Sequence, residues 1–227
     1  MSTQSATLLP ELAAALGMPA AMWLTGMLVD PCGGQLTGSA LAPSLQNASP
    51  KRKREFLAGR HTAMHALQSA GLASADMPGR ASDGLPVWPS GWTGCISHCH
   101  DLALSAVAPT DICSTIGLDI ERWIEPSVME EIAPQITHPA ELDSLDAFPA
   151  SQALTLVFSA KEALYKALYP HVRQFFEFSA ARARHCTQNT LELQLCQDWS
   201  PRWQRGQSLL IHYACLPEHV VTALVID

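Results

Sequence analysis

The feature that most restricts the fold of this chain is the order of its hydrophobic patterns. A helical pattern covers residues 49–71, with Ser49 suited to cap the first turn. Two short alternating segments, 94–97 and 102–108, follow a loop rich in glycine and proline and are typical of a β-hairpin. A third strand pattern covers residues 112–121. The first half of the chain therefore combines a helix with antiparallel strands.

The same order returns in the second half. A helical pattern covers residues 151–169 and is expected to stop before Pro170, since proline cannot donate an amide hydrogen bond. Three strand patterns then follow, at 190–196, 208–215 and 219–226. This repetition predicts an α+β fold made of two similar halves, residues 1–111 and 112–227.

Composition excludes several classes of protein. The chain has 227 residues, of which 48% are apolar and 15% charged, so a buried core is expected and a disordered chain is not. No long apolar run is free of polar residues, which argues against a membrane segment. The net charge of −7 argues against general binding of nucleic acid. Scattered cysteines and a start without basic residues favour the cytoplasm.

Two carboxylates are placed together by the strand that runs from Ile116 to Glu121. Alternation puts Gly117, Asp119 and Glu121 on one face, which the glycine is expected to leave open, and the apolar residues on the other. Carboxylates two positions apart, roughly 6.6 Å along the backbone, can lean onto one ion. Oxygen ligands alone favour Mg²⁺ over Zn²⁺. The alternative interpretation is an edge strand with a solvated acidic face.

The helix at 154–168 carries a second unusual pattern. Lys161 falls within its apolar stripe, where a lysine needs an anion or must extend to solvent. Glu162 and Lys166 lie on a neighbouring face, four residues apart. They form either an ordinary surface pair or, with Lys161, part of a site for a metal-bound phosphate.

A basic cluster lies at the start of the first helix. Residues 51–54 are Lys, Arg, Lys and Arg, at the end of a helix where the dipole disfavours cations, and Arg60 projects from about the same side as Lys53. The cluster predicts a partner with phosphate or carboxylate groups. A solvated basic patch, or contact with the acidic connector of the same chain, is the alternative.

Five short motifs resemble those of one enzyme family. They are FLAGR at 56–60, GLPVWP at 84–89, CISH at 95–98, GLDIE at 117–121 and FSAKEALYKAL at 158–168. Their order and spacing resemble the 4′-phosphopantetheinyl transferases of the surfactin-synthetase-activating type, most closely the subgroup of enterobactin synthetase component D. The resemblance covers about residues 50 to 170.

The resemblance implies both an architecture and a reaction. Members of the family have two halves related by a pseudo-twofold axis, with the active site in the cleft between them. They use Mg²⁺ to transfer the phosphopantetheine arm of coenzyme A to a serine of an apo acyl or peptidyl carrier protein, and they release adenosine 3′,5′-bisphosphate. The resemblance also implies coenzyme A and the carrier as partners, without nucleic acid or membrane, and a monomer would suffice.

The second half of the chain would supply the metal ligands. Carried over by motif, Asp119, Glu121 and Glu162 would hold Mg²⁺ on the coenzyme A pyrophosphate. Glu162 would also accept the proton of the carrier serine, directly or through water. Lys166 would steady the pyrophosphate, with Lys161 as a second cation.

The first half would bind the other end of coenzyme A. Ser97 and His98 would contact its phosphates, with His98 also counted among the catalytic residues. Arg60 and the basic cluster, Lys53 included, would receive the 3′-phosphate. The adenine would lie beside the loop formed by Gly84, Leu85 and Pro86.

Two residues depart from the family pattern, and two other functions remain as alternatives. Phe158 stands where the family often has tryptophan, and Cys95 stands where serine is common. One rival is a Mg²⁺-dependent phosphohydrolase that acts on a nucleotide or coenzyme A, with water in place of the serine. The other is a module that binds coenzyme A without catalysis. Which carrier and which pathway are served is left open.

Overall fold

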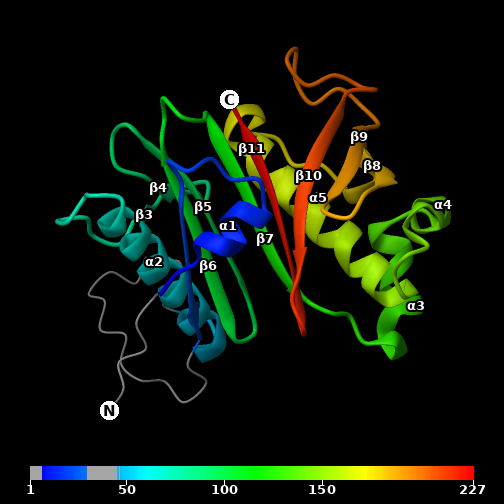
Figure 1. Cartoon of the computed structure of the whole chain (residues 1–227), viewed down its shortest axis with the longest axis horizontal. Helices are drawn as coiled ribbons and strands as arrows, with labels where there is room; N and C mark the ends of the chain where they lie inside the picture. The colour runs from blue at the N-terminus through cyan, green and yellow to red at the C-terminus, as the bar shows by residue number, and fades with distance from the viewer. Residues whose placement is uncertain (1–6, 30–44, 46) are drawn as a thin grey trace. The chain divides into compact units, whose positions relative to one another are not determined.

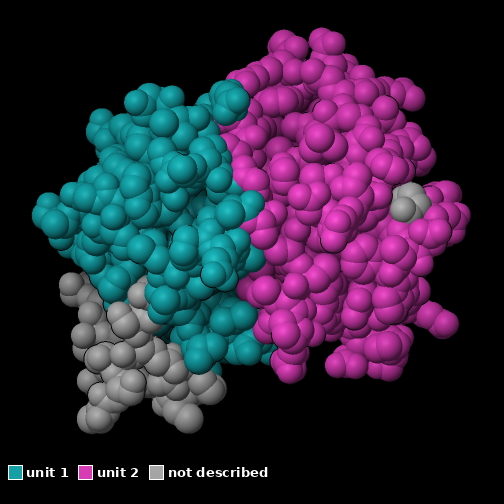
Figure 2. Space-filling model, viewed as in Figure 1, with its two compact units in different colours: residues 1–14, 18–116, 227 teal, residues 15–17, 117–226 magenta. Residues whose placement is uncertain are grey.

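The computed structural model describes residues 7–29, 45 and 47–227 (Figure 1). Contacts divide the chain into two compact units, shown in teal and magenta in Figure 2. Unit 1 comprises residues 1–14, 18–116 and 227, and unit 2 comprises residues 15–17 and 117–226. The division thus falls after residue 116, inside a strand, whereas the sequence pattern suggested residue 111.

Unit 1 is built on a four-stranded sheet in the order β1-β2-β6-β5. Its long helix α2 packs on β2, β5 and β6. The remaining strands, β3 and β4, form a separate short pair. The elements are β1 (Thr7–Leu8), α1 (Pro10–Ala15), β2 (Trp23–Leu28), α2 (Pro50–Ser69), β3 (Gly79–Arg80), β4 (Pro86–Val87), β5 (Trp92–Cys99) and β6 (Leu102–Pro109).

The predicted helix and hairpin of unit 1 are confirmed. The Ser49 side chain accepts a hydrogen bond from the Arg52 amide (3.2 Å), as a capping serine should. Strands β5 and β6 pair antiparallel, with Ser97 opposite Leu104. Elements β1, α1 and β2 were not predicted, and β2 completes the sheet beside β6.

Unit 2 is built on a five-stranded sheet in the order β7-β11-β10-β9-β8. Helix α5 packs on β9, β10 and β11 and buries leucines against them. The smaller helices α3 and α4 pack against α5. The elements are β7 (Thr115–Arg122), α3 (Pro126–Ile136), α4 (Pro139–Leu142), the 3₁₀ turn η2 (Asp143–Leu145), α5 (Ala150–Val172), the 3₁₀ turn η3 (Phe178–Ala180), β8 (Ala181–Cys186), β9 (Thr190–Leu195), β10 (Ser208–Cys215) and β11 (His219–Ile226).

Each unit repeats one topological arrangement. In each unit one strand precedes the long helix, in unit 2 with α3 and α4 between them, and the last strand of the unit lies beside that strand, β6 beside β2 and β11 beside β7. The α+β class and the repeated order of elements agree with the sequence analysis.

The sequence patterns missed one feature of unit 2 and misplaced another. The connector between β7 and α5 is largely helical, because Pro126 and Pro139 occupy first helical positions, where a missing amide hydrogen costs nothing. Helix α5 also continues past Pro170 to Val172, since a proline in the last turn removes only one bond. Arg173, with φ 52°, ends the helix by donating its amide hydrogen to the carbonyl of Tyr169 (2.9 Å).

No helix in the described part of the chain is long and apolar enough to cross a membrane. Six cysteines in that part are free thiols, and Cys32 lies outside it.

Candidate active site

Strand β7 and helix α5 approach each other closely at Gly117. A Cβ atom at this position would overlap the carbonyl oxygen of Ala163, which is backbone and cannot swing aside. The expectation that Gly117 leaves its face open is therefore wrong, because the helix itself fills that space. The glycine allows the helix to lie against the strand that carries Asp119 and Glu121.

Asp119 is held by two donors from α5. Its Oδ2 atom accepts a hydrogen bond from Ser159 Oγ (2.8 Å), and its Oδ1 atom lies 2.6 Å from Lys166 Nζ. Ser159 Oγ also lies 2.9 Å from Thr222 Oγ1 on β11. The carboxylate is only 2% exposed, so these contacts fix it between strand and helix.

Glu121 and Glu162 place two more carboxyl groups around Asp119. Burial and the neighbouring Asp119 raise the pKa of Glu121 to about 8, with a smaller contribution from Glu162. Burial also raises the pKa of Glu162; Lys166 opposes this shift, and Asp119 adds to it. The structure thus brings together three predicted carboxylates and Lys166, and one lysine cannot offset three carboxylates.

This donor set fits a hard divalent cation. A positive ion would lower the raised pKa values of Glu121 and Glu162, and oxygen ligands suit Mg²⁺. The three residues do not form a cluster in which every ligand atom lies within 4.8 Å of the others, judged over the described residues. An ion bound by all three would have to draw the side chains together.

An aromatic cavity adjoins Glu162. It has a volume of about 230 Å³, and its walls come from α5, from the segment before β8 and from the loop after β9. Phe158 packs on Phe178 and Tyr165 packs on Phe175, with ring centroids 5.5 and 5.8 Å apart. The principal lining residues are Glu162, Tyr165, Phe175, Phe176, Phe178 and Trp199.

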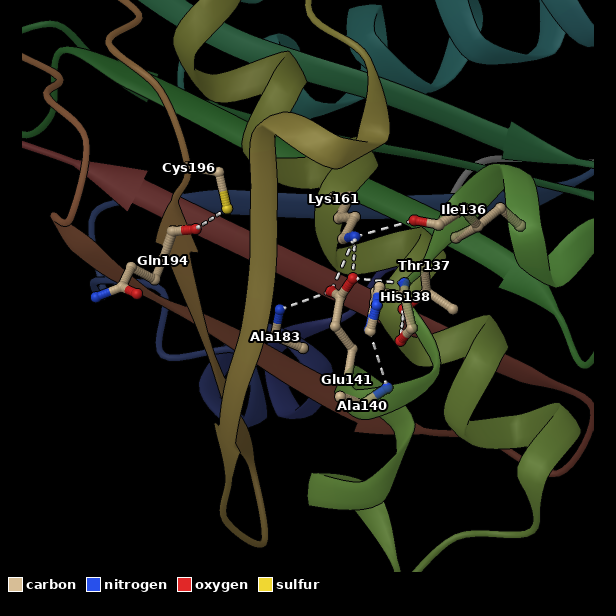
Figure 3. Close-up of polar contacts among 9 residues, drawn as sticks. All are labelled: Ile136, Thr137, His138, Ala140, Glu141, Lys161, Ala183, Gln194 and Cys196. Atoms are coloured by element: carbon tan, nitrogen blue, oxygen red, sulfur yellow. Dashed lines mark hydrogen bonds and ion pairs between the residues drawn. The ribbon is translucent and has the colours of Figure 1, made fainter.

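Lys161 does not join the carboxylate group. Its Nζ atom lies 2.9 Å from Glu141 Oε2 and donates to the carbonyl of Ile136 (2.9 Å), as Figure 3 shows. Burial lowers the pKa of Lys161, and the Glu141 carboxylate opposes that shift. The anion that the apolar stripe required is therefore supplied by a protein carboxylate, and the phosphate contact at this lysine stays a prediction.

In unit 1, Arg60 meets the predicted adenine loop through Arg80. Burial and the neighbouring Arg80 lower the pKa of Arg60 to about 10. Its Nη1 atom is buried and has no hydrogen-bond partner among the described residues. Gly84, with φ +91°, leaves space that Arg80 Nη2 occupies, 3.3 Å from where a Cβ would stand. One buried cation, Arg60, and one exposed cation, Arg80, thus lie together beside this loop, and guanidinium groups suit a phosphate dianion.

The loop itself is a tight turn. The amide of Leu85 donates to Asp83 Oδ1 (3.2 Å), and the amide of Ala81 donates to the carbonyl of Leu85 (2.9 Å). Pro86 then begins β4. The predicted residues of this loop are thus held beside Arg80.

His98 lies against the basic start of α2. Arg52 Nη1 donates to His98 Nε2 (2.8 Å), which makes the imidazole an acceptor at that atom. His98 Nδ1 lies 3.9 Å from Glu55 Oε2, and Glu55 also faces Lys51 and Arg52 at 3.9 and 3.8 Å. The basic cluster therefore has a carboxylate partner one turn along its own helix.

Two other predicted residues lie close by. Lys53 is half-buried on α2. Ser97 is buried, and alternation along β5 directs its side chain to the opposite face from that of His98. The two side chains of the Ser-His pair thus face different surroundings.

Several site residues were missed by the sequence analysis. Arg80 precedes the GLPVWP motif by a few positions, and Glu55 follows the basic cluster directly, so both had a local signal. Glu141 had no local sequence signal, because its partner Lys161 is distant in sequence. The aromatic segment from Phe175 to Phe178 was visible but carried no helical or strand period.

Comparison with protein-family models gives two matches. The model of the 4′-phosphopantetheinyl transferase N-terminal domain matches residues 40–108. The model of the 4′-phosphopantetheinyl transferase superfamily matches residues 115–224. The first range covers α2 and the hairpin, and the second covers the carboxylates and helix α5.

Three similar proteins extend this comparison. Enterobactin synthase component D of Salmonella typhimurium is 39% identical over 153 residues, which are 66% of this chain and 62% of the relative. The protein of the same name from Escherichia coli strain K12 is 41% identical over 125 residues, 54% of this chain and 58% of the relative. The 4′-phosphopantetheinyl transferase Npt of Nocardia iowensis is 33% identical over 132 residues, 58% of each chain.

The matches span less than two thirds of the length of these relatives. The two family models, however, match adjoining ranges that together take in most of the chain. The chain therefore belongs to the 4′-phosphopantetheinyl transferase superfamily.

Proposed function

We propose that this protein transfers the 4′-phosphopantetheine group of coenzyme A to a serine of an apo acyl or peptidyl carrier protein, with adenosine 3′,5′-bisphosphate as the other product and with Mg²⁺ required. The relatives named enterobactin synthase component D favour a carrier of peptide or siderophore synthesis. The observation that carries the proposal is the group of three carboxylates with a single lysine, beside an aromatic cavity.

Asp119, Glu121 and Glu162 would hold the Mg²⁺ ion. When bound, the ion would offset negative charge on the pyrophosphate of coenzyme A and on the departing bisphosphate. Lys166, which already neutralises Asp119 at 2.6 Å, would add a positive charge beside the same pyrophosphate.

Glu162 is the proposed proton acceptor. Burial raises the pKa of its carboxyl group, which makes it a stronger base than an exposed glutamate. It would take the hydroxyl proton of the carrier serine, directly or through a water molecule. The serine oxygen would bond to the phosphorus that bears the pantetheine arm, and the bond from that phosphorus to the bisphosphate would break.

The remaining parts of coenzyme A suit other residues. Its pantetheine arm, whose methyl and methylene groups suit aromatic side chains, would lie in the aromatic cavity beside Glu162. Its 3′-phosphate would be received by Arg60, whose buried Nη1 has no hydrogen-bond partner in the described part of unit 1, with Arg80 and Lys53 as further cations. The adenine would lie beside Gly84, Leu85 and Pro86, and His98 with Arg52 would contact a phosphate. Ser97 stays a predicted contact, while Lys161 is left out of the phosphate group because Glu141 neutralises it.

Mass spectrometry of an apo carrier incubated with the protein, coenzyme A and Mg²⁺ tests this function. The carrier should gain the mass of one phosphopantetheine group, and EDTA should prevent the gain. Release of the bisphosphate without a carrier would instead support a phosphohydrolase. Binding of coenzyme A with no product under any condition would support a non-catalytic module.

A further inference from the structure

The buried pair Lys161–Glu141 closes a network that joins four elements of unit 2. Lys161, on α5, donates to the last carbonyl of α3, at Ile136, and contacts both oxygens of Glu141 at 3.2 and 2.9 Å. Glu141 Oε1 accepts from the amide of His138 (2.8 Å), and Glu141 Oε2 accepts from the amide of Ala183 on β8 (2.8 Å). Figure 3 shows these contacts converging on Glu141.

Burying the two charges of this network costs free energy, so stability alone does not explain why the pair is there. The two side chains are only 3% and 5% exposed. Removing two charges from water costs several kcal/mol per ion, and apolar residues of similar size often stabilise a protein as well or better. What a fully hydrogen-bonded pair adds over apolar packing is a single fixed geometry.

The network holds α5 at the residue next to Glu162. Successive residues of a helix point about 100° apart, so a fixed direction for Lys161 also fixes the direction of Glu162. On the other side of Glu162, Ala163 lies against Gly117 of β7. Helix α5 is therefore held in place on both sides of Glu162, the third residue of the carboxylate group.

We propose that Glu141 and Lys161 are positioning residues, which set the rotation of α5 so that Glu162 can share one divalent cation with Asp119 and Glu121. This inference rests on the cation site proposed above. Neither residue contacts substrate in it; the pair acts through the helix.

Binding of Mn²⁺ to the complete protein, followed by titration calorimetry, tests the inference without any transfer reaction. Glu141→Gln and Lys161→Met should each weaken Mn²⁺ binding by about tenfold or more, as changes behind metal ligands commonly do. The double variant should be little worse than either single variant, since both break the same connection.

Two controls separate positioning from charge and from stability. Glu218→Gln removes one carboxylate from an exposed pair with Arg122, so it matches the charge change of Glu141→Gln and should alter Mn²⁺ binding by less than about twofold. Leu191→Ala destabilises the same core without touching the network and should also leave Mn²⁺ affinity nearly unchanged. All variants are compared at a temperature at which circular dichroism shows them folded.

Three results would overturn the inference. Unaltered Mn²⁺ affinity in folded Glu141→Gln and Lys161→Met proteins would make the network merely structural. Weaker coenzyme A binding in EDTA for Lys161→Met, with Glu141→Gln unaffected, would make Lys161 a phosphate ligand. Absence of Mn²⁺ binding by the unaltered protein would remove the cation site and this inference with it, whereas failure of transfer alone would leave both standing.

Discussion

Helix α5 contacts two buried acidic centres that are neutralised to very different extents. Glu141 meets Lys161 and two backbone amides, so each of its oxygens has donors. Around Asp119 three carboxylates face Lys166, and burial and crowding raise the pKa values of Glu121 and Glu162. A buried charge with all its partners in the chain serves architecture, whereas several carboxyl groups crowded around one lysine indicate a ligand from outside.

The largest expected effect comes from removing the central carboxylate. Asp119→Ala should lower phosphopantetheine transfer by at least about a hundredfold, because the other two carboxylates then lack the ligand that Lys166 and Ser159 hold in place. Transfer assays over a range of Mg²⁺ concentrations measure the effect. Near-normal turnover of this variant at limiting Mg²⁺ would refute the assignment of the Asp119 centre, and not the Glu141 centre, as the ligand site.

Truncating the other acidic centre should also lower the stability of the fold. Glu141→Ala leaves Lys161 buried without its carboxylate and should lower the free energy of unfolding by about 3–5 kcal/mol. Glu218→Ala, at an exposed pair with Arg122, should cost no more than about 1 kcal/mol. Urea unfolding followed by circular dichroism compares them, and equal losses would contradict the contrast between buried and exposed pairs.

A smaller loss is expected where α5 approaches β7. Gly117→Ala forces the helix away from the strand and should lower the free energy of unfolding by about 1–3 kcal/mol. Gly79→Ala is the matched control, because its added Cβ would stand 3.8 Å from Val87 in ordinary contact. A Gly117→Ala protein as stable as the control would show that the helix can retreat freely.

The mildest test is a pH series on the metal-free protein. The pKa of Glu121 is raised from 4.5 to about 8, so the folded protein keeps a proton that the unfolded chain releases. Stability should therefore fall as the pH rises from about 5 to 8, and Mg²⁺ should reduce the fall. Thermal unfolding across this range measures it, and Glu121→Gln should flatten the profile; an unchanged slope in that variant would assign the proton elsewhere.

Sequence patterns predicted the helices and strands with strong local signals better than the long-range contacts. The capped helix after Ser49, the hairpin and the last three strands have strong periodicity and turn signals, and all of them form. Strand β8 escaped notice because Ala181 and Ala183 are its buried residues, which give a weak hydrophobic alternation. Helices α3 and α4 were hidden by prolines that begin helices as well as break them.

In the candidate site, too, local spacing could be predicted and long-range contacts could not. Asp119 and Glu121 share a face because strands alternate, and Glu162 and Lys166 share one because helices repeat, so both pairs could be placed from spacing alone. The partner of Lys161 could not, because the pattern shows a lysine in an apolar stripe but not which of 21 acidic residues reaches it. Tertiary folding decides that choice.

Position 117 matters through an atom that it lacks. Because the helix backbone occupies the place of a side chain there, every replacement should be poorly tolerated in a saturation mutagenesis experiment, although the residue touches no substrate group in the proposed reaction. Such a profile would look like that of a ligand-contacting residue. The cause, however, would be the short distance between the strand and helix backbones. A substitution that compensates for a larger residue at position 117 is therefore expected on the helix, around Ala163 and Ala167, and not among the carboxylates.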